Sequence, residues 1–185
     1  MKKRQKFGLA PESASIRRKN VRPRRKSDYG ARLEQKQKLK FIYGIMERQM
    51  KRYASEALEG KGDAQVDLLR RLESRLDNVV YRLGFGKTRE AARQLVAHGH
   101  VLVDGKKLDI PSYFMQPGQV VSLHKKIMGS QKFRETVTAN RKDLVTFGHL
   151  TYDADGGRFL ALPAKADLPQ DVDISQVLQF YHQML

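Results

Sequence analysis

The side chains of this sequence that could do chemistry are arginines and lysines, and the chemistry they favour is phosphate binding. Arg89 and Arg93 are four residues apart, so they share one face of a predicted short helix. A guanidinium group presents a planar pair of N–H donors that matches a phosphate group. The cluster around this helix comprises Arg82, Lys87, Arg89, Arg93, Lys106 and Lys107. Scattered, solvated charge is the alternative interpretation of this cluster taken alone.

The distribution of charge along the chain points to the same kind of partner. The first 52 residues hold 18 lysines and arginines against four acids, and so contribute +14 of the formal net charge of +16. Cations that displace counterions from phosphates gain affinity from the released ions. A long, arginine-rich segment of one sign therefore predicts a nucleic acid partner, whereas a shorter run would be an ordinary solvated face.

Other kinds of site find little support. The 185 residues include no cysteine, which excludes disulfides, thiolate nucleophiles and cysteine zinc ligands. Gly86-Lys87-Thr88 imitates the end of a phosphate-binding loop, but Tyr81 stands where that motif needs glycine, and a helix precedes it. His98 and His100 adjoin a predicted basic hairpin and could touch phosphate, although ordinary surface positions are the simpler interpretation.

The sequence also gives expectations about location. No apolar stretch approaches the ~20 residues that cross a bilayer, and the basic N-terminus lacks the apolar run of a secretion signal. An organellar transit peptide remains an alternative for this basic leader. The lack of cysteine fits a reducing compartment.

The elements that must position these cations follow from hydrophobic spacing. Residues 1–26 are basic and poor in large apolar groups, so they are expected to order only on RNA. Residues 31–58 read as one long helix with an apolar face and a basic face. A second helix over 64–83 and a third over 89–98 form an αα-hairpin, and Gly84 and Gly86 between them suit positive φ.

Beyond residue 100 the period changes to two. Strands are predicted at 101–103 and 106–108, joined by an Asp104-Gly105 type I′ turn, and at 120–123, 149–152 and 159–162. A helix is predicted over 174–185. Because its surroundings are acidic and its apolar residues numerous, we expect it to dock on the N-terminal helices near Phe41, Ile45 and Met46.

The arginine cluster belongs to a longer pattern that resembles a known domain. Residues 75–86 (RLDNVVYRLGFG), with 88–96 and 101–105, are similar to the S4 RNA-binding domain. Residues 27–30, 33–38 and 43–49, and the ending from Asp173-Ile174, resemble the bacterial-type small-subunit ribosomal protein S4 family. The resemblance covers about 27–185 and is loose after 129.

The resemblance implies an α+β fold with an inserted domain. It divides the chain into a basic extended tail (1–26), a helical domain (27–72 with 173–185) and an inserted domain (73–172). The S4 RNA-binding domain, an αα-hairpin with a small antiparallel sheet, occupies about 73–135 of that insertion. Members often carry a zinc-binding cysteine cluster near the N-terminus, which this cysteine-free chain lacks. We therefore expect no metal and no cofactor.

The resemblance also implies a function. Such proteins are structural constituents of the small ribosomal subunit that bind rRNA at a helix junction of its 5′ domain and nucleate assembly. They contribute to mRNA entry and translational accuracy, and they contact ribosomal protein S5. The expected location is the cytoplasmic ribosome, with an organellar ribosome as an alternative. Two alternatives are a stand-alone S4-domain RNA-binding protein and an rRNA-modifying enzyme, but the chain has no catalytic-size domain or nucleophile for the latter.

The residues expected to bind RNA come from the tail, the long basic helix and the S4-like segment. They are Lys2, Lys3, Arg4, Arg17, Arg18, Arg22, Arg24, Arg25, Lys26, Tyr29, Arg32, Lys36, Lys38, Arg48, Arg75, Asn78, Arg82, Lys87, Thr88, Arg89, Arg93, Lys106 and Lys107.

Overall fold

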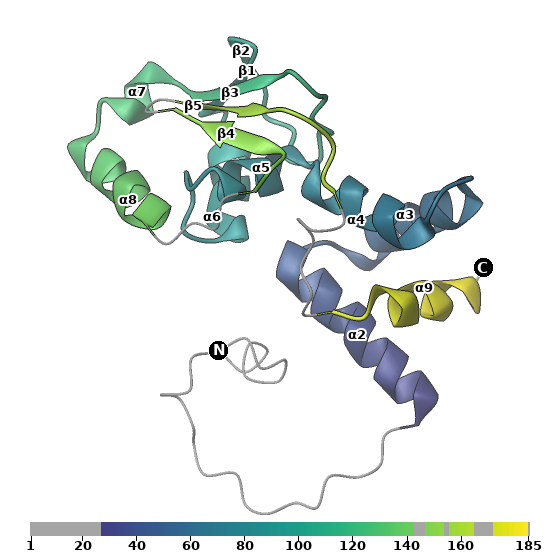
Figure 1. Ribbon diagram of the computed structural model, residues 1–185. Helices are drawn as coiled ribbons and strands as arrows, with labels where there is room; N and C mark the ends of the chain where they lie inside the picture. Colours follow the sequence, from purple (N-terminus) through teal and green to yellow (C-terminus); the bar gives the residue numbers. More distant parts are fainter. Residues whose placement is uncertain (1–26, 143–146, 154–155, 165–171, 185) are drawn as a thin grey trace, which may run out of the picture.

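The structure is a computed structural model that describes residues 27–142, 147–153, 156–164 and 172–184 (Figure 1). The predicted RNA-binding residues of the tail, from Lys2 to Lys26, lie outside the described residues. One part of the molecule is all helical and the other packs helices on a small antiparallel sheet, which confirms the predicted α+β class. No helix within the described ranges is long and apolar enough to span a membrane.

The prediction of a single helix over 31–58 is wrong, because the helix ends at Gly44 and a second helix follows. Helix α2 (Asp28–Tyr43) begins at Ser27, whose hydroxyl accepts from the Gly30 N–H, and ends at Gly44 with φ 62°. The N–H groups of Gly44 and Ile45 bond to the carbonyls of Phe41 and Lys40, as in a Schellman cap. Helix α3 (Glu47–Glu59) then runs in a new direction (Figure 1).

The predicted helix over 64–83 is also two helices, α4 (Ala64–Glu73) and α5 (Leu76–Arg82). Between them Arg75 is extended and forms an isolated bridge with Phe114. The Leu76 N–H donates to the Tyr113 carbonyl at 2.8 Å, and the Met115 N–H donates to the Ser74 carbonyl at 2.8 Å. This pairing with a distant segment breaks the helix, and helical spacing cannot reveal such a partner.

The inserted part of the chain packs helices against the sheet. Helix α6 (Arg89–Ala97) lies beside α5, and the sheet has the order β2-β1-β3-β5-β4, antiparallel throughout. Its strands are β1 (Val101–Val103), β2 (Lys106–Lys107), β3 (Val120–Leu123), β4 (Leu150–Tyr152) and β5 (Gly156–Phe159). Helices α7 (Lys125–Met128) and α8 (Gln131–Lys142), which sequence spacing did not predict, follow β3.

Two turns test the sequence predictions for the sheet. Asp104 and Gly105 have φ 49° and 76°, which confirms the positive-φ pair of a type I′ turn. The strand predicted over 159–162 is displaced, since β5 spans Gly156–Phe159 and includes Gly156 and Gly157. A Cβ on Gly157 would stand 2.4 Å from Leu83 Cδ2, so glycine lets the strand approach α5 closely.

The buried side chains form two cores. One core joins α2, α3 and α4 to helix α9 (Ile174–His182), and the other joins α5 and α6 to the sheet. Helix α9 therefore packs on the N-terminal helices, as predicted (Figure 1). Ile45 is buried and Phe41 half-buried, but the prediction for Met46 is wrong because it is 80% exposed. The domain boundaries proposed from the resemblance remain a prediction.

Gly86 is required by a close approach and not by its backbone angle. Positive φ occurs at Gly84 (78°), while Gly86 has none, which corrects the sequence expectation for Gly86. A Cβ on Gly86 would lie 2.7 Å from the Ala92 N atom of α6.

We expect Gly86→Ala to lower the free energy of unfolding by about 1–3 kcal/mol, measured by chemical denaturation. Gly129→Ala, where the Cβ meets nothing nearer than 3.5 Å, is the matched control and should be nearly neutral. Equal effects of the two changes would contradict this account.

Candidate nucleic-acid interface

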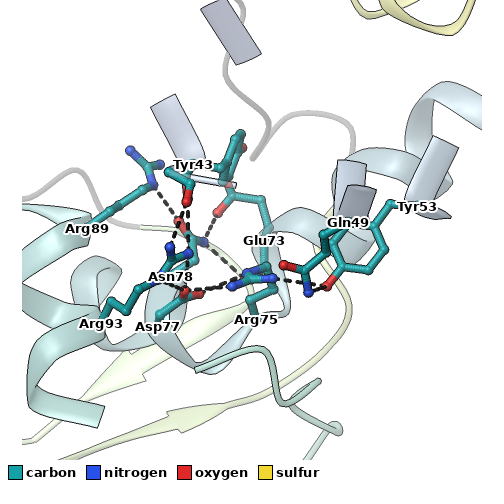
Figure 2. A network of polar contacts seen from close by, with 10 residues as sticks. Tyr43, Gln49, Tyr53, Glu73, Arg75, Asp77, Asn78, Arg89 and Arg93 are labelled. Carbon is teal, nitrogen blue, oxygen red and sulfur yellow. Dashed lines mark hydrogen bonds and ion pairs between the residues drawn. The ribbon is translucent and has the colours of Figure 1, made fainter. Parts of the chain in front are cut away.

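A buried polar network joins the end of α2 to α5 and α6 (Figure 2). Its centre is Glu73, whose side chain is fully buried. The Glu73 carboxylate accepts hydrogen bonds from the Tyr43 hydroxyl at 2.5 Å, from Asn78 Nδ2 at 2.6 Å and from the Arg82 guanidinium at 2.7 Å. We call the following set the junction network: Tyr43, Tyr53, Glu73, Arg75, Asp77, Asn78, Arg82, Arg89 and Arg93.

The second carboxylate of the junction network, Asp77, is held between two arginines. Arg75 donates to both of its oxygens at 3.0 and 2.8 Å, and Arg93 donates twice to Oδ2 at 2.9 and 2.7 Å. Arg75 also donates to the Tyr53 hydroxyl on α3, and Arg93 donates to the Gly44 carbonyl at 2.6 Å. The S4-like helices are therefore bonded to the break between α2 and α3.

Arg89 completes the junction network from α6. Its Nε donates to Asn78 Oδ1 at 2.7 Å, and its guanidinium lies 4.8 Å from the Tyr43 ring and 4.5 Å from the Tyr81 ring. Cation–π contacts of this kind stabilise a desolvated guanidinium. Burial nevertheless lowers the pKa of Arg89, because it disfavours the charged form.

The electrostatics of the junction network favour fixed charges. Burial opposes ionisation of Glu73, but the hydrogen bonds and charge of Arg82 outweigh burial and lower the pKa of the carboxyl. Burial likewise opposes the charge of Arg82, and its bond to Glu73 raises the pKa of that arginine overall. Four arginines face two carboxylates, so the junction network carries a formal surplus of two positive charges.

The junction network changes the interpretation of several predicted RNA-binding residues. Arg75 and Asn78 are each 2% exposed and bonded inside the protein, so their burial does not fit direct contact with RNA. Arg82, Arg89 and Arg93 are partly exposed, but each donates hydrogen bonds to other side chains of the protein. The sequence signal that was missed is the pair of acids, Glu73 and Asp77, on either side of Arg75.

Lys36 is a further predicted RNA-binding residue that faces inward. It is 7% exposed, donates to Glu47 Oε1 at 3.0 Å and lies 4.4 Å from the Phe180 ring. Glu47 also accepts from Lys40 at 2.5 Å and from the Tyr181 hydroxyl at 2.9 Å. This cluster ties α9 to α2 and α3. The amphipathic pattern placed Lys36 on the basic face because it could not show that α9 covers that side.

The Glu47 cluster predicts a pH effect on stability. Partial burial opposes ionisation of Glu47, but the bonds from Lys40, Lys36 and Tyr181 outweigh it and lower its pKa to about 2. A depressed folded-state pKa stabilises the fold above the unfolded value of about 4.3, and that contribution is lost as pH falls towards 2. We expect Glu47→Gln to reduce the loss of stability between pH 4.5 and 2, measured by urea denaturation. Because half of this side chain is exposed, the effect should be modest, and an unchanged pH profile would contradict it.

The remaining predicted RNA-binding residues of the described chain are exposed or half-buried. Tyr29, Arg48, Lys87, Lys106 and Lys107 are exposed, and Arg32, Lys38 and Thr88 are half-buried. Thr88 caps α6 by accepting from the Ala91 N–H at 3.1 Å, so its hydroxyl already has a structural role.

An open hollow on α3 gathers further cations. It is lined by Met46, Arg48, Gln49, Lys51, Arg52, Ser55 and Glu56. Arg52 pairs with Glu56 at 3.5 Å, while Arg48 and Lys51 enter no ion pair in the described part of the chain. The described residues contain no cluster of three or more histidines and acids that could hold a metal ion. The guanidinium of Arg48 and the ammonium of Lys51 suit this surface to an anion.

Comparisons with known proteins identify the family of this chain. Residues 74–121 match the S4 domain, and residues 3–73 match the ribosomal protein S4/S9 N-terminal domain. The fold and the first match define an S4-domain protein. The small ribosomal subunit protein uS4 of Acholeplasma laidlawii is 46% identical over 160 residues, covering 84% of this chain and 78% of that protein.

Two further relatives are also small ribosomal subunit proteins uS4. The protein of Persephonella marina is 45% identical over 157 residues, covering 84% of this chain and 77% of its own. That of Thermotoga petrophila is 45% identical over 159 residues, covering 84% and 75%. This chain belongs to the small ribosomal subunit protein uS4 family. The family consists of structural proteins of the ribosome, and the enzyme alternative is set aside.

Proposed function

We propose that this chain is a primary rRNA-binding protein that nucleates assembly of the 5′ domain of the small ribosomal subunit. The observation that carries the proposal is the junction network, which fixes two exposed basic surfaces relative to each other. One surface is the α3 hollow with Arg48 and Lys51, and the other is the S4-like part of the chain, on which Lys87 and Lys106 are exposed. A rigid pair of surfaces can hold two RNA helices at one angle, as nucleation of a junction requires.

Phosphate and 2′-hydroxyl groups are the expected contacts of these surfaces. A-form RNA hides its base edges in a deep, narrow groove, so cations on helices and on a hairpin recognise its backbone and shape. Because the two surfaces are pre-oriented, binding at one raises the effective concentration at the other. The arginines of the junction network then contribute mainly by positioning.

Contacts with ribosomal protein S5 and with mRNA at the entry path, together with an effect on translational accuracy, are part of the proposal. In support of a protein contact, residues 150–185 carry five acids against two bases. Tyr152, Leu160 and Leu162 in this region are 43–49% exposed, which suits a protein surface better than RNA. The proposed location is the cytoplasmic ribosome, with an organellar ribosome as the alternative.

The test is the salt dependence of binding to a naked 5′-domain rRNA fragment. With about eight phosphate contacts, the log–log slope of affinity against salt should be roughly −6 to −7. Arg48→Gln with Lys51→Gln should make the slope shallower by about 1.5–2 units without a change in melting temperature. Lys61→Gln, an exposed change in the α3–α4 loop, is the control. A wild-type slope near −1 would overturn the proposed electrostatic interface.

A further inference from the structure

One corner of the sheet gathers basic and imidazole side chains that neither the junction network nor the α3 hollow includes. Helix α6 ends beside this corner, β1 and α7 begin at it, and β3 ends at it (Figure 1). We call it the histidine corner: His98, His100, Lys107, His124, Lys125 and Lys126. His100 is half-buried, and the other five residues are exposed.

Backbone pairing brings these residues together. Val101 pairs with Leu123 across β1 and β3, and the His124 N–H donates to the His100 carbonyl at 2.8 Å. The rings of His98 and His100 lie 6.0 Å apart at a steep angle. A Cβ on Gly99 would stand 2.0 Å from Lys107 Cε, so the lysine crosses directly over that glycine.

The orientation of the His124 ring makes it a donor toward solvent. Its Nδ1 accepts the Lys126 N–H at 3.2 Å, so in the neutral ring the proton is on Nε2. The exposed Nε2–H can therefore donate to an anion beside the ammonium groups of Lys125 and Lys126. None of the three lysines of the corner takes part in an ion pair within the described ranges.

The chemistry of the corner selects its ligand. Its lysines supply three positive charges, and no large exposed hydrophobic residue of the described chain belongs to it. An apolar protein surface would find nothing to bury there. Lysine and imidazole N–H groups suit phosphate oxygens, and histidine rings also stack on unpaired bases of RNA.

We propose that the histidine corner is an additional RNA-binding site, which takes the phosphate backbone of a segment next to an unpaired base. The inference rests on the proposed rRNA-binding function and adds a contact surface to it. It places RNA at the end of the sheet, whereas the hollow is on α3, a helix that lies away from the sheet (Figure 1).

The test compares two variants of the full chain on the same rRNA fragment. Lys107→Gln/Lys125→Gln/Lys126→Gln removes three exposed charges of the corner, whereas Lys51→Gln/Lys61→Gln/Lys142→Gln removes three exposed charges elsewhere. Losing three phosphate contacts should make the salt slope shallower by about 2–3 units and weaken binding about fifty- to a hundredfold at 0.15 M salt. The control variant includes one cation of the α3 hollow, Lys51, so its salt slope should become shallower by only about one unit.

A separate variant tests the histidine. His124→Asn keeps a side-chain oxygen that can cap α7 but removes the imidazole donor, and we expect binding to weaken several-fold at an unchanged melting temperature. If the triple variant has a lowered melting temperature, Lys126→Gln alone is tested instead. It should make the log–log slope of affinity against salt shallower by about one unit. A corner variant with the wild-type slope and affinity would overturn the histidine corner alone. Failure of the wild-type chain to bind would overturn the proposed function with it.

Discussion

Truncation of the chain before Asp173 is expected to unfold the helical domain while the S4 domain stays folded. Helix α9 contributes buried side chains to the core that it shares with α2, α3 and α4. These are Ile174, Val177, Leu178, Phe180 and Tyr181, each 6% exposed or less. At about 1.5–3 kcal/mol for each buried side chain, their loss removes roughly 8–15 kcal/mol before entropy costs. That is comparable with the whole stability of a typical small domain.

Circular dichroism and hydrogen exchange would separate the two domains. The truncated chain should lose exchange protection in α2 and α3 but keep it in β1, β3 and β5, because these strands belong to the other core. The matched control removes only Gln183–Leu185, of which Gln183 and Met184 are exposed, and should melt like the full chain. Retained protection in α2 after the longer truncation would refute the docking role of α9. We expect the longer truncation also to weaken any contact with ribosomal protein S5.

Replacement of Glu73 by alanine is expected to be the most damaging single change in the junction network. It leaves Arg82 without its buried acceptor, removes one of the two acceptors of Asn78 Nδ2 and removes the partner of the Tyr43 hydroxyl. Breaking one side of a buried ion pair costs about 3–5 kcal/mol, because the remaining charge is uncompensated. For a chain of this size the melting temperature should fall by roughly 6–20 °C.

Two controls separate burial from charge. Glu135→Ala removes an exposed carboxylate on α8 and should change stability by less than about 0.5 kcal/mol. Glu73→Gln keeps the shape of the side chain but not its charge, so it should be intermediate if charge matters. At a temperature where Glu73→Ala remains folded, its rRNA affinity should fall although residue 73 is fully buried. Unchanged stability and affinity would show that the junction network does not hold the two domains together.

The junction network also alters the expectation for Arg89→Ala/Arg93→Ala. The sequence predicts that these arginines contact phosphate. On that prediction alone, the double change would lower RNA affinity and leave the stability of the protein unchanged. In the structure Arg93 donates to Asp77 and to the Gly44 carbonyl, and Arg89 donates to Asn78. A loss of RNA affinity in this variant therefore has to be separated from a loss of stability.

The sequence by itself determined the features that local patterns encode. The charge of the first 52 residues predicted a polyanion partner, and the Asp104-Gly105 pair predicted a type I′ hairpin that the structure contains. The resemblance of residues 75–96 identified the S4 domain, which the family match confirms. The apolar residues after Asp173 predicted a docked helix, and α9 packs on α2. Each of these signals lies within one short segment of chain.

Only the tertiary structure decided which cations face solvent. Tyr43 and Glu73 are 30 positions apart, and Arg93 and Gly44 are 49 apart, yet both pairs are bonded. Spacing places an arginine on a helix face but cannot show that a carboxylate from another segment covers that face. The helix break at Arg75 has the same origin, since the distant segment around Phe114 pairs with the chain there, whereas the break at Gly44 is made by a local cap. Burial depends on the folded chain as a whole. It explains why the arginines of the junction network bond inside the protein, whereas lysines such as Lys87 and Lys107 are exposed and can bind an anion.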